Sequence, residues 1–168
     1  MRTIYIISGA CGIGKSTITK KLFEQIKDSV RIEGDFFLHL FEGKEEVMSW
    51  EDRIKFSWDN ILSTTRTIIN YNFDVIIDFV VEEELSWFCE NVKDLNVHIK
   101  YVVLTADKEQ LLKNIQKRGT LDITERSLFL HEKFNNSELH KSFLLDITGK
   151  DLQNIAEFII KESRFIVK

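Results

Sequence analysis

The stretch 8–17, SGACGIGKST, decides the fold of this chain because it has the glycine and lysine spacing of a phosphate-binding loop. Gly9, Gly14, Lys15 and Ser16 satisfy the pattern G-x-x-x-x-G-K-[ST]. An apolar run precedes the loop and a stretch of helical spacing follows it, which is the context in which this pattern is specific. The backbone N–H groups of such a loop converge on phosphate oxygens, and the following helix adds the positive end of its dipole. The sequence therefore predicts a nucleoside-triphosphate site.

The residue types in the loop have separate chemical tasks. Lys15 is expected to reach the β and γ phosphates of ATP, and the Ser16 hydroxyl is expected to bind Mg²⁺. Cys11 is interpreted as a spacer, with a redox-sensitive thiol as the alternative. The alternative for the whole motif is a glycine-rich turn with Lys15 in solvent. The predicted ATP contacts in the loop are Gly9, Ala10, Cys11, Gly12, Ile13, Gly14, Lys15, Ser16 and Thr17.

The composition is that of an ordinary globular protein. The 168 residues suit one compact domain over 1–168, and 43% of them are apolar and 30% charged. A net charge of -4 argues against a surface that neutralises nucleic-acid phosphates, so we expect no nucleic-acid partner. Two cysteines are too few for a disulfide framework or a zinc site, and the first apolar run is too short for a membrane span. We expect a cytoplasmic protein without membrane association.

Short apolar runs alternate with segments of helical spacing along the chain. The pattern predicts a doubly wound α/β sheet with right-handed crossovers, because runs of this kind are typical of strands buried on both faces. Apolar stripes within 54–69 and 152–160 predict helices that pack on the sheet. The tail RFIVK is consistent with either an edge strand or the end of a helix. The predicted strands are 3–8, 29–33, 74–78, 97–104 and 142–146.

Two acidic residues look like helix N-caps. Asp107 is followed by Gln110, and Asp122 by Glu125, each at the spacing of a capping box. These pairs predict helices that start near 108 and near 123.

Carboxylates follow two of the predicted strands. Asp78 ends the run VIIDF, as expected of an acid that holds Mg²⁺, although an Asp here also suits a cap of the next turn. Glu33 and Asp35 are two residues apart in IEGDFF, so both should project to the same side of the chain. Ligands of open α/β sheets bind beyond the carboxyl ends of the strands. A carboxylate there can take the proton of a substrate hydroxyl. The alternative for Asp35 is a helix N-cap.

Taken together, these features resemble the small P-loop kinases of the shikimate kinase, gluconate kinase and chloramphenicol phosphotransferase type, within the nucleoside-monophosphate-kinase-like fold. The resemblance covers essentially the whole chain, in order. It implies a three-layer α/β/α fold with a five-stranded parallel sheet of order 2-3-1-4-5 and a lid segment. The segments that carry it are GACGIGKST (9–17), EGD (33–35), LLKNIQKRG (111–119), ITERSLFLHEKF (123–134) and LDITGKD (145–151).

The resemblance also implies roles for residues outside the loop. Glu33 takes an outer-sphere metal role, and Asp35 orients the substrate and acts as base. Arg118 and Arg126 bracket a lid at about 118–125 and close over the triphosphate. The alternative for both arginines is a solvated cation near a helix end. The resemblance places Thr148, Gly149 and Lys150 in the loop that cradles adenine, and the predicted metal residues are Ser16, Glu33 and Asp78.

The sequence departs from these kinases in the lid and in the acceptor region. Asn114 stands where related lids often carry another arginine, and FVVEEE after the third run lacks the paired glycines of shikimate kinase. Arg53 is the only arginine between 32 and 60, whereas nucleoside-monophosphate kinases use several. We expect the acceptor segment at about 36–60 to bind a neutral or weakly charged hydroxyl compound. Trp50 or Phe36 could wall a ring-shaped pocket there, or simply be core.

The sequence as a whole predicts an ATP- and Mg²⁺-dependent phosphotransferase that moves the γ-phosphate to a hydroxyl of a small-molecule acceptor. The catalytic residues expected are Lys15, Asp35, Arg118 and Arg126. The alternative is a nucleotide-binding or regulatory ATPase without such an acceptor. A polynucleotide-end kinase is disfavoured by the acidic balance, and the sequence does not indicate an oligomeric state.

Overall fold

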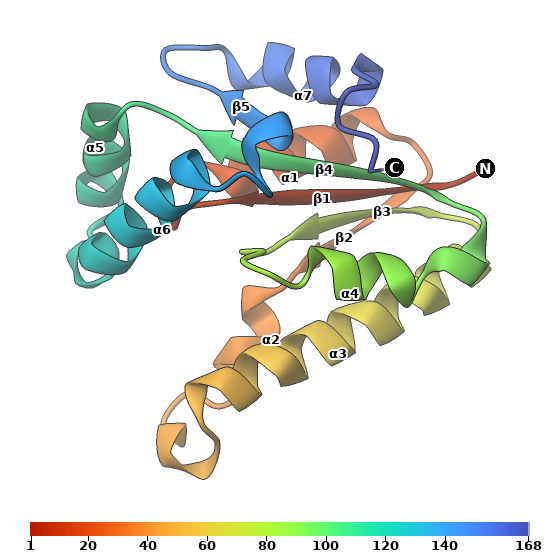
Figure 1. Ribbon diagram of the computed structural model, residues 1–168, viewed down its shortest axis with the longest axis horizontal. Helices are drawn as coiled ribbons and strands as arrows, with labels where there is room; N and C mark the ends of the chain where they lie inside the picture. The colour runs from red at the N-terminus through yellow and green to blue at the C-terminus, as the bar shows by residue number, and fades with distance from the viewer. Residues whose placement is uncertain (168) are drawn as a thin grey trace.

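The computed structural model describes residues 1–167, apart from the side chain of Glu45. Its five strands form one parallel sheet of order β2-β3-β1-β4-β5, which confirms the predicted fold (Figure 1). The strands are β1 (Thr3–Gly9), β2 (Ser29–Glu33), β3 (Asp74–Asp78), β4 (His98–Thr105) and β5 (Leu144–Asp146).

The helices form two layers around this sheet. In Figure 1, α1 and α7 lie together on one face, while α3, α4 and α6 lie on the other. The helices are α1 (Lys15–Gln25), α2 (Asp35–His39), α3 (Trp50–Asn70), α4 (Leu85–Glu90), α5 (Lys108–Arg118), α6 (Thr124–Asn136) and α7 (Leu152–Lys161). Short 3-10 turns occupy Glu45–Val47, Lys93–Leu95, Leu121–Ile123 and Lys141–Phe143. None of the helices in the described part of the chain is long and apolar enough to cross a membrane.

The core lies on both faces of the central strands. Six of the seven residues of β1 and four of the five of β3 are buried, which explains why these strands read as continuous apolar runs. The two predicted helical stripes supply the covering layers, with Trp58, Ile61 and Thr65 buried on α3 and Ile155 and Ile159 buried on α7.

The C-terminal part of the chain differs from the prediction at two places, the start of β5 and the tail. The strand expected at 142–146 starts only at Leu144, because 141–143 form a 3-10 turn closed by a hydrogen bond from Phe143 N–H to the His140 carbonyl. The tail RFIVK forms neither of the two expected elements. It makes one isolated antiparallel bridge between Ile166 and Lys100, and Phe165 is buried beneath it.

One of the two predicted N-caps is confirmed. Asp107 caps α5, its side chain accepting a 2.7 Å hydrogen bond from the Gln110 N–H. The prediction for Asp122 is wrong, because this residue lies in the 3-10 turn before α6 and the helix begins at Thr124 without a side-chain cap. Asp122 is part of this 3-10 turn, and Ile123 occupies the N-cap position of α6 instead.

Candidate nucleotide site

The glycine loop joins the carboxyl end of β1 to the first turn of α1. Gly9 has a φ of 135°, and a Cβ there would lie 2.6 Å from the Leu104 carbonyl oxygen on the neighbouring β4. Any other residue would therefore be both strained and in collision with the sheet. Gly14 caps α1 in the left-handed region, and Lys15 begins the helix. This geometry leaves the first N–H groups of α1 at the crevice beyond the strand ends.

The Lys15 side chain is folded back over its own loop. Its Nζ donates hydrogen bonds of 3.1 Å to the carbonyls of Gly9 and Ala10, and only 9% of the residue is exposed. The ammonium therefore lies inside the curve of the loop, where a phosphate would be held. Ser127 on α6 buttresses the same loop, since its Oγ donates a 2.6 Å bond to the Cys11 carbonyl.

Asp78, at the end of β3, is the buried carboxylate of the site. Burial raises its pKa, and the Lys15 ammonium, a hydrogen bond from Ser16 and one from Thr19 each act to lower it. The Thr19 Oγ1 lies 3.2 Å from the Asp78 Oδ2. The structure thus brings Lys15, Ser16 and Asp78 together, with Thr19 beside them. A hydroxyl and a carboxylate beside a phosphate loop fit Mg²⁺, which binds proteins through few side chains and keeps waters and phosphates as its other ligands.

Glu33 is held by an arginine that the sequence analysis did not single out. It stands beside Asp78 in the register of β2 and β3, but its side chain forms an ion pair with Arg31. The Arg31 Nη1 also lies 3.9 Å from the Asp78 Oδ2, and the Arg31 side chain is only 16% exposed. Arg31 therefore sits between the two carboxylates assigned to the metal. Of these two, Asp78 is the one that shares a hydrogen bond with Ser16.

Asp35 begins α2 at the mouth of the same crevice. The Gly34 N–H donates a 2.9 Å hydrogen bond to the Asp78 carbonyl, which fixes the start of α2 next to β3. Asp35 is exposed, and its charge acts to raise the pKa of Asp78. The capping alternative is excluded, since the N-cap of α2 is Gly34 and Asp35 makes no side-chain cap.

The two arginines predicted for the lid have different surroundings. Arg118 ends α5 and lines a cavity beside the loop. Arg126, near the start of α6, pairs instead with Glu82 and lies over the ring of Phe129. Glu82 comes from the segment after β3 and also accepts a 2.9 Å hydrogen bond from Lys133. A switch of Arg126 to a phosphate would require it to leave this carboxylate.

The cavity beside the loop, called the loop cavity below, has a volume of about 480 Å³. Three parts of the chain enclose it: the loop with α1, the helix α5, and the segment 147–152. Of the predicted contacts outside the loop, it contains Arg118 and Lys150. Its lining residues are Ile13, Gly14, Thr17, Gln110, Asn114, Lys117, Arg118, Ile147, Lys150 and Leu152. This volume lies within the usual range of small-molecule sites.

Thr148 and Gly149 take structural hydrogen bonds. The Gly149 N–H donates to the Gln110 side chain at 2.9 Å, tying the 147–152 segment to α5. The Thr148 hydroxyl donates to Asp146 at 2.7 Å and accepts from the Asp107 N–H at 2.8 Å. These bonds shape the wall of the loop cavity, although Thr148 itself lines a different cavity.

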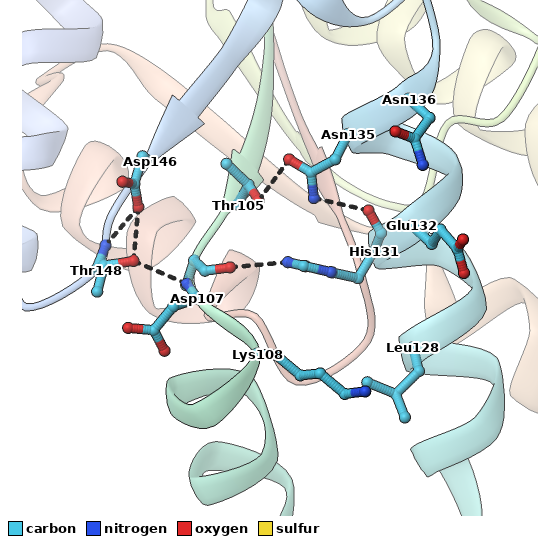
Figure 2. A pocket seen from close by; sticks show the side chains of 11 residues that line it. Thr105, Asp107, Lys108, Leu128, His131, Glu132, Asn135, Asn136, Asp146 and Thr148 are labelled. Atoms are coloured by element: carbon cyan, nitrogen blue, oxygen red, sulfur yellow. Dashed lines mark hydrogen bonds between the residues drawn. The ribbon is translucent and has the colours of Figure 1, made fainter.

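That neighbouring cavity, of about 670 Å³, lies between the ends of β4 and β5 and the helix α6 (Figure 2). His131 Nε2 lies 2.8 Å from the Ala106 carbonyl, and Asn135 hydrogen-bonds the Thr105 hydroxyl at 3.1 Å. Figure 2 shows Asp146 and Thr148 paired on the opposite side. The side chains of Thr105, His131, Asn135, Asp146 and Thr148 bond one another or the backbone, and we assign this cavity no ligand.

Sequence reasoning missed Arg31, Thr19 and Glu82. Thr19 follows Ser16 by three residues on a helix, so helical spacing alone would have placed it on the same face. Arg31 precedes Glu33 by two on a strand, and the same argument applies to it. Glu82 carries no such local signal. Among the described residues, no group of three or more His, Cys, Asp or Glu side chains is placed to hold a metal ion alone.

Comparisons with known proteins agree with this geometry. The model of a family described as an AAA domain matches residues 4–132. The tunicamycin resistance protein of Deinococcus radiodurans has a similar structure, with a TM-score of 0.68 and 16% identity over 95% of this chain and 94% of that one. A gluconokinase from Sinorhizobium meliloti gives a TM-score of 0.66 and 14% identity over 95% and 91%.

A chain of the Pnkp1/Rnl/Hen1 RNA repair complex is also similar, with a TM-score of 0.60 and 22% identity. That match covers 78% of this chain and 44% of the RNA repair chain. A search among curated proteins finds no match. At these identities the solved structures show the fold that this chain shares with them.

Proposed function

The chain belongs to the AAA domain family, and from that premise we propose that it is an ATP- and Mg²⁺-dependent kinase acting on a hydroxyl of a small molecule. The observation that carries the proposal is the convergence of Lys15, Ser16 and Asp78 at the mouth of the loop, next to a cavity of about 480 Å³. Phosphoryl transfer depends mainly on positioning and on charge stabilisation, and this arrangement supplies both.

The reaction assigns a separate role to each group. The acceptor oxygen forms a bond to the γ-phosphorus of ATP while the bond from that phosphorus to the ADP oxygen breaks. Asp35 takes the proton of the acceptor hydroxyl, and Lys15 neutralises the β and γ phosphates. Ser16 and Asp78 would hold Mg²⁺, which neutralises phosphate charge when bound. Glu33 would act in the outer coordination sphere of Mg²⁺, and Arg31 would compete with the ion for the Glu33 carboxylate.

We also propose that the whole chain, residues 1–168, forms one domain. The residues 36–60, which include all of α2 except Asp35 and the start of α3, would bind the acceptor. The residues 118–125, between α5 and α6, would act as the lid, with Arg118 already facing the loop cavity. Thr148, Gly149 and Lys150 would support adenine. We propose a cytoplasmic location.

An acceptor screen tests the activity most directly. Release of ADP would be followed over sugars, sugar acids, amino alcohols and nucleosides, with a 5′-hydroxyl oligonucleotide included because of the RNA repair likeness. We expect turnover with a small molecule and none with the oligonucleotide, since a net charge of -4 disfavours a polyanion. ATP hydrolysis that no acceptor increases would instead favour the regulatory ATPase.

The matched variants are Asp35→Asn and Asp28→Asn. The first removes the base while leaving ATP binding intact, so we expect kcat to fall by about 10²- to 10⁴-fold. Asp28 is an exposed residue before β2, and its replacement should leave kcat unchanged. Full turnover in Asp35→Asn would remove Asp35 from the mechanism.

A further inference from the structure

A cavity of about 420 Å³ between α3 and α4 is lined by all three tryptophans of the chain. Trp50 and Trp58 come from α3, and Trp87 comes from α4. Trp50 is 47% exposed and Trp87 39%, whereas Trp58 is buried. We call this space the tryptophan cavity. Its size and aromatic walls are those of a small-molecule site.

Acidic side chains surround the same space. Glu51, Asp59 and Glu84 line the tryptophan cavity, and Lys55 is the one cation among its described lining residues. Glu84 is held in place, because its Oε2 accepts hydrogen bonds from the backbone N–H groups of Glu82 and Glu83 at 2.8 and 3.0 Å. The three carboxylates outnumber the cations nearby, which are Lys55 in the lining and Arg53 over the Trp50 ring, and this excess of negative charge favours a cationic ligand.

The indole rings favour the same ligand. A tryptophan face is the best aromatic partner for a cation, and Arg53 already lies over the Trp50 ring at 5.4 Å from its centroid. Trp58 adds a polar requirement: its buried indole N–H has no hydrogen-bond partner among the described residues. A ligand that carries an oxygen could supply the acceptor that this N–H lacks.

The tryptophan cavity lies one aromatic ring away from the nucleotide site. The Trp58 ring packs against Phe79 at 5.4 Å between centroids, and Phe79 directly follows Asp78. Phe79 also packs under Gly34, the residue before Asp35. The Phe79 ring therefore connects the cavity to the end of β3, where transfer would take place.

We propose that the tryptophan cavity recognises the acceptor, and that the acceptor is a hydroxylated, ring-bearing ammonium compound. The ring stacks between the indoles and the ammonium faces Glu51 and Asp59. The assignment of this ligand as phosphate acceptor rests on the proposed kinase function, but the binding preference does not. The acceptor proposed for the tryptophan cavity is therefore a cation, whereas the sequence alone predicts a neutral or weakly charged compound.

Intrinsic fluorescence tests the binding preference directly, because every tryptophan of the protein lines the cavity. The protein would be titrated with benzylamine, benzyl alcohol and benzoate, which share one ring and differ in charge at neutral pH. We expect benzylamine to quench with a Kd roughly fivefold below that of benzyl alcohol, as a cation–π and carboxylate contribution implies, and benzoate to bind weakest. Equal binding of all three, or no quenching by any, overturns the proposal.

Matched variants identify the groups responsible. Glu51→Gln with Asp59→Asn should reduce the preference for benzylamine over benzyl alcohol to the part that the cation–π contact contributes. Glu24→Gln with Asp28→Asn, which removes the same net charge elsewhere, should leave the preference intact. Loss of the preference in both double variants would show that it comes from net charge, and would overturn the proposal.

An aromatic variant tests the wall of the cavity. Trp87→Leu should weaken benzylamine at least about threefold, as the loss of one cation–π contact implies. The control is Phe158→Leu, an exposed aromatic change on α7, and it should have no effect. Unchanged affinity in Trp87→Leu overturns the stacking role of the indoles. Circular dichroism of each variant confirms that it is folded.

Stabilisation by Mg²⁺·ATP, measured in parallel, separates the two hypotheses. If nucleotide stabilises the protein but no probe prefers a cation, the present inference fails and the kinase proposal stands. If benzylamine binds selectively but nucleotide does not stabilise the protein, the kinase proposal fails and the cation preference of the cavity stands. Turnover of an aminomethyl-substituted benzyl alcohol, and its loss on N-acetylation, would support both.

Discussion

Asp78 is the residue on which burial and bonding act in opposite directions. Burial raises its pKa, while Lys15, Ser16 and Thr19 all favour the ionised form. Because the folded pKa lies above the ordinary value of 3.8, this residue contributes stability below that pH and loses it as the pH rises through the folded pKa. A bound Mg²⁺ would favour the carboxylate and offset this loss. Ionised Asp78 therefore lowers the stability of the free protein, but its negative charge is the one that would bind Mg²⁺.

Replacement of Thr19 by valine tests the support that its hydroxyl gives to Asp78. The change keeps the shape of a fully buried side chain and removes a donor to a carboxylate. We expect the free energy of unfolding to fall by about 1–2 kcal/mol in urea denaturation, the usual range for a hydrogen bond to a charged group. Thr67→Val, an exposed threonine on α3 bonded only to the backbone, should change it by less than about 0.5 kcal/mol. Equal effects in the two variants would contradict the role of Thr19.

Gly34 is required by the ring of Phe79. A Cβ on Gly34 would lie 2.4 Å from the Phe79 Cγ, although the backbone there is ordinary for any residue. We expect Gly34→Ala to cost about 1–3 kcal/mol through overpacking. In a Phe79→Leu background the same change should cost less than about 1 kcal/mol, since the ring is gone. Additive effects in this double-mutant cycle would show that the collision is not the cause.

At the scale of elements, the segment after β3 connects the two halves of the sheet. Glu82 accepts from Arg126 and Lys133 of α6 through its side chain, and from His140 through its carbonyl. His140 is buried and also contacts the Tyr101 hydroxyl on β4, with 3.0 Å between the hydroxyl oxygen and Nδ1. Since a carbonyl only accepts, Nε2 carries the hydrogen and the neutral ring accepts from Tyr101.

This network predicts a pH-dependent stability. Burial lowers the pKa of His140, and the nearby Lys133 ammonium acts in the same direction, whereas Glu82 and Glu84 oppose it. Its contribution is therefore complete above the ordinary pKa of 6.5 and is lost as the pH falls toward the lower folded value. We expect the urea concentration at the midpoint of unfolding to decrease as the pH is lowered from about 7 to about 5. His140→Gln should flatten that dependence, and His98→Gln, at an exposed position on β4, should not.

At the scale of the whole molecule, the loop cavity exists only because distant segments meet. The loop, α5 and the 147–152 segment are far apart in the chain, and the bond from Gly149 N–H to Gln110 closes one wall. A nucleotide that bridges these segments should stabilise the entire fold, because it binds only the native state.

Thermal unfolding measures this linkage. With Mg²⁺·ATP at about 100 times its Kd, we expect an added 2.7 kcal/mol or so, and a rise in Tm of roughly 5–10 °C for a chain of this size. Removal of Mg²⁺ with EDTA should reverse most of the shift. Lys15→Ala should abolish it, whereas Lys20→Ala, an exposed lysine on α1, should retain it. A shift that survives in Lys15→Ala would place ATP elsewhere.

Most of the fold can be predicted from local patterns in the sequence. The five strands, the two apolar helical stripes and the Asp107 cap lie within contiguous segments, where periodicity and capping chemistry act over a few residues. The errors occur at 122 and at 142–143, where 3-10 turns replace the expected cap and the expected start of a strand. Such turns depend on how the chain approaches its neighbours.

The sequence by itself determined the phosphate loop, the parallel sheet and the placing of Asp78 at a strand end, because each follows from residues adjacent in the chain. Tertiary structure alone decided that Arg31 approaches Asp78, that Glu82 holds Arg126, and that three tryptophans share one cavity. Each of these sets meets across elements and depends on register, packing and side-chain rotamers. No local periodicity encodes those, so only the folded chain could show which partners each side chain has.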